Sequence, residues 1–113
     1  MKCWGDGATG KLGNGSWSDQ HVPHYVMLGY NGGPSLAAEY YSYGHFGLAR
    51  MIDGSIQGWG ENGQNQIGCD TQNDPNCWWG GGQNTPLQTN MPPSRTAMQV
   101  SPGLHHSCAI MND

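Results

Sequence analysis

Residues 3–13 read CWGDGATGKLG and residues 58–68 read GWGENGQNQIG, so one pattern recurs at an offset of 55 residues. Each copy carries Trp-Gly, an acidic residue, a turn-forming residue, an aliphatic residue and a closing glycine. The tryptophans are Trp4 and Trp59, and the aliphatic residues are Leu12 and Ile67. A period of this length is typical of a propeller or a solenoid, in which neighbouring units cover faces that one unit cannot bury.

A second match occurs at an offset of 60 residues. It aligns residues 37–40 with 97–100, and residues 49–53 with 109–113. The five-residue change between the two offsets falls between Cys69 and about Arg95. We assign most of this change to an insertion that runs from Cys69 to Cys77.

The composition favours strands over helices. The chain has 19 Gly and 7 Pro, and 11% of its residues are charged. A helix longer than about ten residues cannot persist against the glycine penalty. Short apolar runs between turn-forming clusters predict strands instead. The expected strands are residues 1–4, 22–28, 37–42, 45–52, 55–59, 86–89, 97–101 and 106–111.

Two local structures deserve separate mention. Residues 51–56 read MIDGSI, and Asp53-Gly54 predicts a tight two-residue hairpin turn because this dipeptide accepts positive φ angles. Residues 37–42 are expected to form a strand, with a short helix over residues 35–43 as the alternative.

The strongest motif is split between the two parts of the chain. Residues 106–113 read HSCAIxxD and residues 2–15 read KCWGDxxxGxLGNG. In this order, with a turn between them, they resemble the repeat of the regulator of chromosome condensation (RCC1-type) family, whose best-known members are seven-bladed β-propellers. The resemblance covers most of the chain except residues 30–34 and 69–83. Arg50, Phe46 and Gly47 depart from the pattern.

The resemblance implies an all-β chain with about two blades' worth of strands. Residues 37–89 would form one complete blade that contains the insertion 69–83. Residues 1–28 would form the C-terminal half of a blade, and residues 97–113 the N-terminal half. Two blades cannot close a ring, because propellers typically need four to eight.

Both half-blades are expected to expose an unpaired edge strand, which invites pairing with another chain. Pairing of the half-blade at residues 97–113 with the half-blade at residues 1–28 of a second copy is heterologous. It therefore gives a closed ring or an open filament. Roughly three or four copies would supply six or eight blades. The expected partner is the chain itself, as a head-to-tail homo-oligomer.

Two cysteines mark this junction. In the composite blade, Cys108 and Cys3 occupy neighbouring strands, whereas the equivalent positions of the intact blade are Leu48 and Gly58. Directly opposed residues on antiparallel strands come within disulfide range. We therefore expect an intermolecular Cys108–Cys3 bridge.

Cys69 and Cys77 enclose a polar loop that has little to bury, and a local disulfide is the expected staple. Two free thiols remain the alternative. Two sensible cysteine pairs favour an extracellular or secreted location, in a surface filament or a phage component. Neither pair has the Cys-x-x-Cys spacing of a zinc site, so we expect no metal.

Charge and hydropathy exclude several classes of partner. The net charge is −4 with four basic residues, which disfavours nucleic acid. No apolar run reaches the roughly twenty residues of a membrane span. No convergent catalytic set is visible, so we expect neither an enzyme nor a cofactor.

Aromatic residues supply the remaining candidates. Trp78 and Trp79 could form an exposed platform for a protein or glycan ligand. The alternative is that they fill the interface with a neighbouring subunit or cover the disulfide loop. Tyr41 and Tyr43 share one face of an extended strand and are further interface candidates. We place four residues in the blade core: Trp4, Trp59, Leu12 and Ile67.

Two functions fit these patterns. The first is a structural interaction protein that assembles into a ring or an extracellular filament by completing blades between copies. The second is a fragment of a larger secreted or surface propeller that binds protein or glycan.

Overall fold

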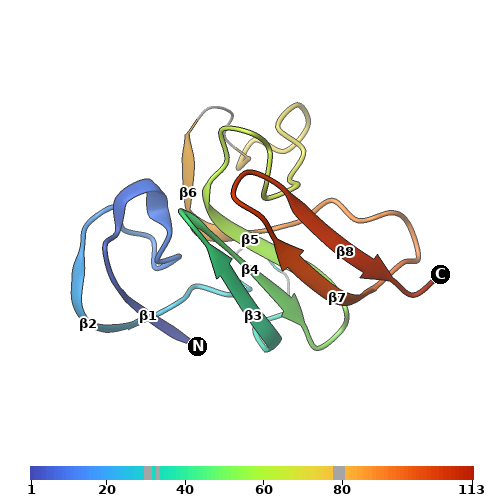
Figure 1. The fold of residues 1–113 in the computed structure, drawn as a ribbon, viewed down its shortest axis with the longest axis horizontal. Helices are drawn as coiled ribbons and strands as arrows, with labels where there is room; N and C mark the ends of the chain where they lie inside the picture. Colours follow the sequence, from blue (N-terminus) through green and yellow to red (C-terminus); the bar gives the residue numbers. More distant parts are fainter. Residues whose placement is uncertain (30–31, 33, 78–80) are drawn as a thin grey trace.

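Three separate antiparallel sheets follow one another along the chain (Figure 1). The computed structural model describes residues 1–29, 32, 34–77 and 81–113. We call the sheet β1-β2 the N-sheet, the sheet β3-β4-β5-β6 the central sheet, and the sheet β7-β8 the C-sheet. The strands are β1 (Lys2–Gly5), β2 (Gln20–Tyr25), β3 (Ala37–Tyr43), β4 (Phe46–Met51), β5 (Ile56–Glu61), β6 (Gly82–Gln88), β7 (Ala97–Pro102) and β8 (Ser107–Met111), and a 3-10 helix, η1, spans Ala8–Gly10.

The predicted fold class is confirmed: the chain is an all-β array of one four-stranded sheet between two two-stranded sheets. All eight expected strands are present, with ends shifted by a few residues. The alternative of a helix over residues 35–43 is wrong, because β3 lies there and its burial alternates along the first residues of the strand. The 3-10 helix η1 was not predicted.

The hairpin between β4 and β5 differs from the predicted two-residue turn. Met51 N–H donates to Ser55 O at 2.8 Å, which leaves a three-residue loop of Ile52, Asp53 and Gly54. Gly54 N–H closes a turn onto Met51 O at 2.9 Å, and Gly54 alone of the three takes a positive φ, of 82°. The glycine therefore serves the left-handed position after a turn, as in three-residue hairpin loops.

The repeat seen in the sequence is also a repeat of strand register. In the central sheet Ala37 pairs with Met51, and in the C-sheet Ala97 pairs with Met111. A register shift follows the first pair in both sheets, and every later pair corresponds at the same offset of 60 residues. The C-sheet is thus the structural equivalent of β3 and β4.

The N-sheet is in the same way the equivalent of β5 and β6. Cys3 pairs with His24 as Gly58 pairs with Leu87, and Gly5 pairs with Gln20 as Gly60 pairs with Gln83. The offset is 55 for the first strand and 63 for the second, so the insertion at residues 69–77 adds eight residues. The connection from β6 to β7 is three residues shorter than that from β2 to β3, which leaves the net change of five.

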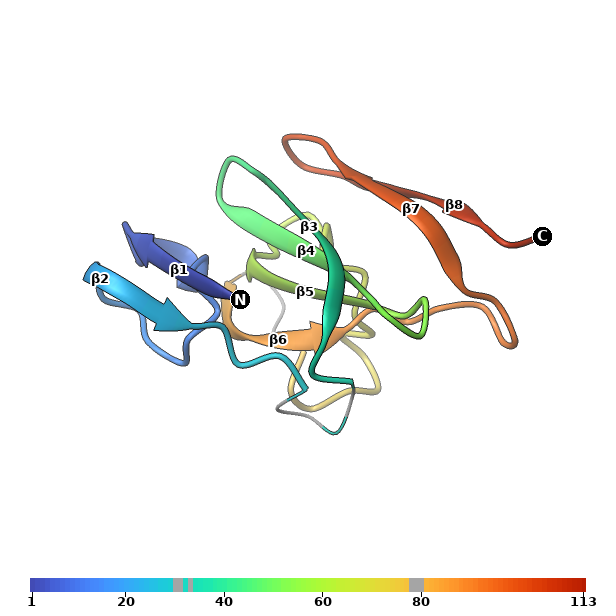
Figure 2. The same ribbon diagram turned by 90° about the horizontal axis from the view of Figure 1, so that it is seen from below.

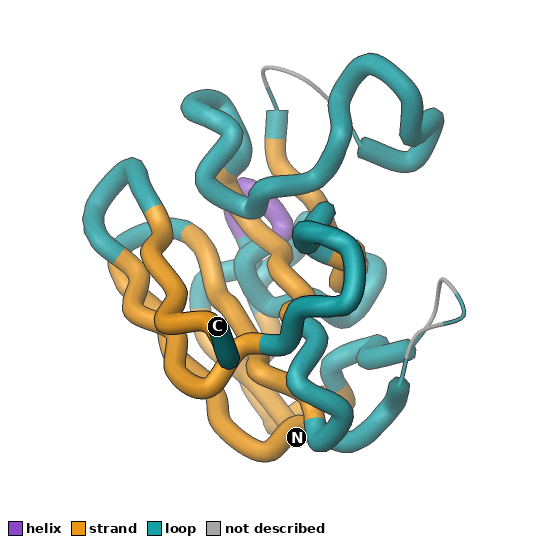
Figure 3. The backbone as a smooth tube through the Cα atoms, turned by 90° about the vertical axis from the view of Figure 1, so that its right-hand side faces the viewer, coloured by secondary structure: helices purple, strands orange, loops and turns teal. Residues whose placement is uncertain are grey.

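The two outer sheets cover opposite faces of the central sheet (Figures 1 and 2). The C-sheet packs through β7 on β3 and β4, where Phe46, Leu48 and Val100 form a buried cluster. The N-sheet approaches the other face, and Trp59 and Val26 are buried between them. Long connecting loops lie to one side of the strands, in teal in Figure 3.

Trp59 is the largest side chain in this second cluster and is 0% exposed. Its indole Nε1–H donates to Lys11 O of the N-terminal segment at 3.0 Å. Its ring stacks on Tyr40, with centroids 5.7 Å apart. A Cβ at Gly47 would lie 3.1 Å from Trp59 Cε2, so the glycine makes room for the stack. Trp59 therefore joins the central sheet to the N-terminal segment.

Replacing Trp59 with Ala should destabilise the fold by about 3–5 kcal/mol, because the cavity would lie between two sheets and could not collapse fully. Urea denaturation measures this change. The matched control is Trp17→Ala, which removes an indole that is 54% exposed and should change stability by about 0.5 kcal/mol or less. Equal losses in the two variants would contradict the assigned role of Trp59.

Candidate interface at the β1 and β8 edges

Two strands of the described structure carry an unpaired edge at positions where the central sheet has a pair. β1 pairs with β2 and β8 pairs with β7, whereas their equivalents β5 and β4 also pair with each other. The N-sheet and C-sheet lie on opposite sides of the central sheet, so these edges cannot meet within one chain (Figure 2). The free edge of β8 therefore corresponds to the β4 edge that pairs with β5, and the free edge of β1 corresponds to the β5 edge. The two free edges do not pair with each other within the chain.

The register between β4 and β5 shows which residues would face each other if β8 and β1 paired in the same way. Leu48 pairs with Gly58, and the equivalent residues are Cys108 and Cys3. Gly47 pairs with Trp59, and the equivalent residues are Ser107 and Trp4.

The hydrogen-bond pattern shows which kind of pair the cysteines would form. Met51 N–H donates to Ser55 O, and Glu61 N–H donates to His45 O at 2.9 Å. Hydrogen-bonded and non-hydrogen-bonded pairs alternate along an antiparallel ladder, so Leu48 and Gly58 are a non-hydrogen-bonded pair. Such pairs have Cα atoms about 4.5 Å apart, within the range of about 4.4–6.8 Å that a disulfide spans. The same geometry at Cys108 and Cys3 would be compatible with a bridge.

Steric detail separates the two kinds of junction. A Cβ at Gly58 would lie 2.8 Å from Ile67 Cγ2 and 3.0 Å from Leu48 Cδ2. In the intact blade, the large side chain of Leu48 therefore lies opposite a glycine, which has no side chain. At the equivalent positions the sequence instead places two small side chains, each ending in a thiol.

Both of these thiols are free in the single chain. Cys3 is half-buried against the cluster that contains Trp59. Burial raises the pKa of its thiol, while a hydrogen bond with Tyr40 acts in the opposite direction. Cys108 is exposed on the outer side of the C-sheet.

The prediction that Trp4 is a core residue is wrong for the single chain, because its side chain is 62% exposed. Its equivalent Trp59 is buried because the N-terminal segment covers it, and no such segment covers Trp4 in the described part of the chain. Leu12 and Ile67 are buried as expected, at 5% and 0% exposed. Trp4 thus remains largely uncovered in the single chain.

Other exposed apolar side chains accompany the two free edges. Tyr25 of β2 is 71% exposed, and Ile110 of β8 is 60% exposed. Ile110 is the equivalent of Arg50, which in the central sheet forms an ion pair with Glu39 at 2.9 Å. Arg50 departs from the repeat pattern, and its charge is paired locally with Glu39.

Cys69 and Cys77 form a disulfide with a Cα separation of 5.9 Å. Both are buried with Ile67 and Leu87, so the bridge anchors the inserted loop to the central sheet. At the start of the loop, Asp70 accepts a hydrogen bond from Asn73 Nδ2 at 2.8 Å. This bond and backbone N–H donors lower the pKa of the Asp70 carboxyl.

The other interface candidates divide into three cases. Trp78 and Trp79 lie outside the described residues. Tyr41 packs against the cluster between the central sheet and the C-sheet, and its hydroxyl donates to Glu39 at 3.2 Å. It is therefore engaged inside the chain, rather than at an outer interface. Tyr43 is 55% exposed beside the turn to β4.

The charged residues show no free basic patch in the described part of the chain. Three basic residues form ion pairs: Lys11 with Asp6, Arg50 with Glu39, and Arg95 with Asp113. The fourth, Lys2, lies 4.5 Å from the centroid of the Tyr25 ring. Among the described residues there is no cluster of three metal-ligating side chains, and no helix is long and apolar enough to span a membrane.

Sequence reasoning missed one feature of this region. A cavity of about 330 Å³ lies between the C-sheet and the loop that follows β5. Its walls include Gln66, Ile67, Val100 and Ser107. The only signal in the sequence was the repeat itself, which aligns Gln66 with Lys11, the residue that accepts the Trp59 hydrogen bond.

Comparison with known proteins finds sequence similarity to a curated protein and structural similarity to proteins of the same fold. No protein-family model matches the sequence. The chain is 28% identical over 110 residues to the ultraviolet-B receptor UVR8 of Arabidopsis thaliana. The aligned region covers 97% of this chain and 22% of that protein. Yeast RCC1 (Prp20), in a structure with Kap60, superposes with a TM-score of 0.69 and 21% identity, covering 97% of this chain and 25% of that chain.

A second structure, that of Prp20p from Saccharomyces cerevisiae, described with its binding to Gsp1p and histones, gives a TM-score of 0.69 at 20% identity. It covers 97% of this chain and 26% of that chain. The chain therefore spans about a quarter of the length of the proteins that it resembles.

Removing the disulfide with Cys69→Ser and Cys77→Ser together should destabilise the chain by about 2–3 kcal/mol, since the bridge closes a short loop and both sulfurs are buried. Thermal or urea unfolding measures the loss. Cys108→Ser is the matched control, because this cysteine is exposed and unbridged. A double variant as stable as the control would contradict the anchoring role.

Proposed function

We propose that this chain, whose fold is that of RCC1-type β-propeller repeats, is a non-enzymatic interaction protein that joins copies of itself head to tail. In the proposed junction β8 of one copy pairs with β1 of the next, and the C-sheet and N-sheet together make one four-stranded blade. Each added copy then contributes its own complete blade and one composite blade. The assembly is a ring or a filament, according to the rotation between copies.

One observation carries this proposal. The C-sheet repeats the register and the register shift of β3 and β4, and the N-sheet repeats those of β5 and β6. The two outer sheets are therefore the two halves of the central sheet, separated between β4 and β5. A second copy supplies to each half what it lacks.

The exposed apolar residues support the same conclusion. Trp4, Tyr25 and Ile110 lie on the two outer sheets and are each at least 60% exposed. Exposed edges flanked by large apolar side chains are sites where proteins associate. Pairing at these edges would give the backbone its missing ladder and cover part of this apolar surface.

A covalent lock completes the proposal. The thiols of Cys108 and Cys3 of the next copy lose two protons and two electrons and form one S–S bond. A disulfide oxidant such as oxidised glutathione takes up the electrons and becomes two thiols. The Cys69–Cys77 bridge supports an oxidising, extracellular location, in which such a lock would persist.

A second function is favoured by the lengths of the related proteins. Because the chain spans about a quarter of them, the alternative is a segment of a larger secreted or surface propeller that binds protein or glycan. In that case the half-blades would be completed by other strands of the larger protein. Cys108 and Cys3 would then not be brought together.

Proline at Ala109 should weaken association by about tenfold or more. By equivalence with Met51, the N–H groups of residues 107, 109 and 111 point away from β7. Ala109→Pro therefore removes a donor from the free edge and adds a ring there, while the β7-β8 ladder is kept. Sedimentation velocity over a concentration series measures the effect. Ala109→Ser is the matched control, because it keeps the donor.

A monomeric wild-type chain at every concentration would overturn self-assembly and leave the larger-propeller alternative. Equal association of the proline and serine variants would show that copies associate through a different surface.

Oxidation should produce covalent multimers larger than dimers. With oxidised glutathione, the wild-type chain should give a ladder or a closed ring on non-reducing electrophoresis, because each copy contributes Cys108 to one junction and Cys3 to another. Cys3→Ser and Cys108→Ser should each stay monomeric, because each head-to-tail junction then holds one thiol with no second thiol opposite it. Reduction should return every band to monomer. Exclusively monomeric wild type after oxidation would contradict the bridge.

A further inference from the structure

The cavity beside the C-sheet matches, residue by residue, the site that Trp59 fills on the other side of the central sheet. Gln66 and Gly68 line the cavity and are the equivalents of Lys11 and Gly13 at the offset of 55. Lys11 O accepts the Trp59 hydrogen bond at 3.0 Å, and a Cβ at Gly13 would lie 2.8 Å from Trp59 Nε1. The wall of the cavity thus repeats the wall of a tryptophan site.

The opposite wall follows the same equivalence. Val100 and Ser107 line the cavity and stand at the positions of Tyr40 and Gly47. In the central sheet these two residues lie directly against the Trp59 ring: Tyr40 stacks on it and Gly47 leaves room for it. Both walls of the cavity therefore correspond to residues that enclose an indole.

The geometry points to a specific occupant: this cavity is a socket for the indole of Trp4 from a second copy of the chain, with the Trp4 Nε1–H donating to Gln66 O. This inference rests on the proposed pairing of β8 with β1. It adds the side chain that would determine the register of that pairing.

Register and exposure select Trp4. In the β4-β5 register, Trp4 of the incoming strand lies opposite Ser107, as Trp59 lies opposite Gly47. The side chain is 62% exposed in the single chain, and Cys3, the next residue along β1, packs toward its own central sheet. Because neighbouring side chains of a strand point to opposite faces, Trp4 faces outward, toward a preceding blade.

The proposed acceptor, Gln66 O, already accepts one hydrogen bond in the single chain and can accept a second. Ser107 Oγ donates to Gln66 O at 2.7 Å. A carbonyl oxygen has two lone pairs, so it can accept from the indole as well. In addition, Gln66 is 3% exposed, and its Nε2 has no hydrogen-bond partner among the described residues. The indole nitrogen is a donor only, so this second donor could meet the face of the ring and not its nitrogen.

The sizes of the lining residues also fit an indole, although not with the same stack. Val100 is smaller than Tyr40, and Ser107 is larger than Gly47. A Cβ at position 47 would lie 3.0 Å from Tyr40 and 3.1 Å from Trp59, so a serine there would crowd the Tyr-Trp stack of the central sheet. The smaller valine returns this space to the ring. The cavity volume of about 330 Å³ can hold one indole.

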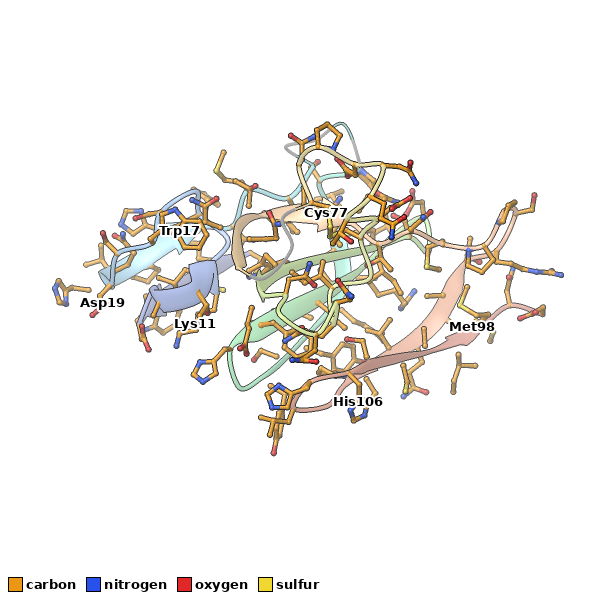
Figure 4. The ribbon with its side chains drawn as sticks, turned by 90° about the horizontal axis from the view of Figure 1, so that it is seen from above. Lys11, Trp17, Asp19, Cys77, Met98 and His106 are labelled. Carbon is orange, nitrogen blue, oxygen red and sulfur yellow. A yellow bond between two sulfur atoms is a disulfide. The ribbon has the colours of Figure 1, made fainter. Side chains whose placement is uncertain are left out.

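The test compares association constants by sedimentation velocity in reducing buffer, so that no disulfide contributes. Trp4→Ala should weaken association by about 30-fold, which is the effect of removing a buried interface tryptophan. Trp4→Phe should fall between Trp4→Ala and wild type, because it fills the socket without the donor. Trp17→Ala is the matched control. Trp17 is exposed in the connection between η1 and β2, outside the two strands that would pair, and lies apart from His106 and Met98 of the C-terminal region (Figure 4). Its removal should change association by about twofold or less.

A second measurement reports on the indole itself. In protein labelled with 5-fluorotryptophan, the ¹⁹F resonance that is lost in Trp4→Phe should shift as the concentration rises, and the Trp17 resonance should not. If wild type associates and Trp4→Ala matches Trp17→Ala, the socket is wrong and the strand pairing stands. If wild type stays monomeric, a second copy is not the occupant, and the proposed function fails with it.

Discussion

The burial of Trp59 between two sheets is the interaction on which the rest of this structure depends. A propeller blade has two apolar faces and cannot bury either by itself. Trp59 solves this for one pair of blades, because it fills the space between them and its indole N–H satisfies Lys11 O on the other side. Glycine at position 47 and the flat ring of Tyr40 are consequences of accommodating this one side chain. Trp4 stands at the equivalent position of the N-sheet and also needs a neighbouring blade to bury it, but its side chain is exposed in the single chain.

Much of the fold could be predicted from the sequence because the repeat allows one part of the chain to be aligned with another. Short apolar runs between turn-forming clusters located the eight strands. The resemblance to RCC1-type repeats then implied that the two ends of the chain are halves of a blade. The Cys69–Cys77 pairing was also accessible, because a polar loop with a cysteine at each end has no better staple. What the offsets could not show was burial. Trp4 and Trp59 stand at equivalent positions of the repeat, yet Trp4 is 62% exposed and Trp59 is buried.

Other differences from expectation have equally local causes. The Asp-Gly dipeptide indicated a hairpin, but the choice between a two-residue and a three-residue loop depends on which residue takes the positive φ, and here Gly54 alone does. Tyr41 and Tyr43 share a face of β3, yet Tyr41 is held between sheets and Tyr43 is not, because β7 packs over part of that strand. The cavity at Gln66 was invisible for a related reason: it is a space left by a residue that another segment would have to supply.

Covalent linkage explains why the intact blade and the proposed composite blade would use different residues at the same positions. β4 and β5 are joined by a three-residue loop, so their pairing costs little loop-closure entropy, and packing alone holds Leu48 over Gly58. β8 and β1 of two copies have no such loop, and their association must offset the loss of translational and rotational freedom. A buried indole would supply affinity and register, and a disulfide between Cys108 and Cys3 would replace the missing loop by a covalent bond. The cysteines would then stand where a connection is needed and Leu-Gly where one already exists.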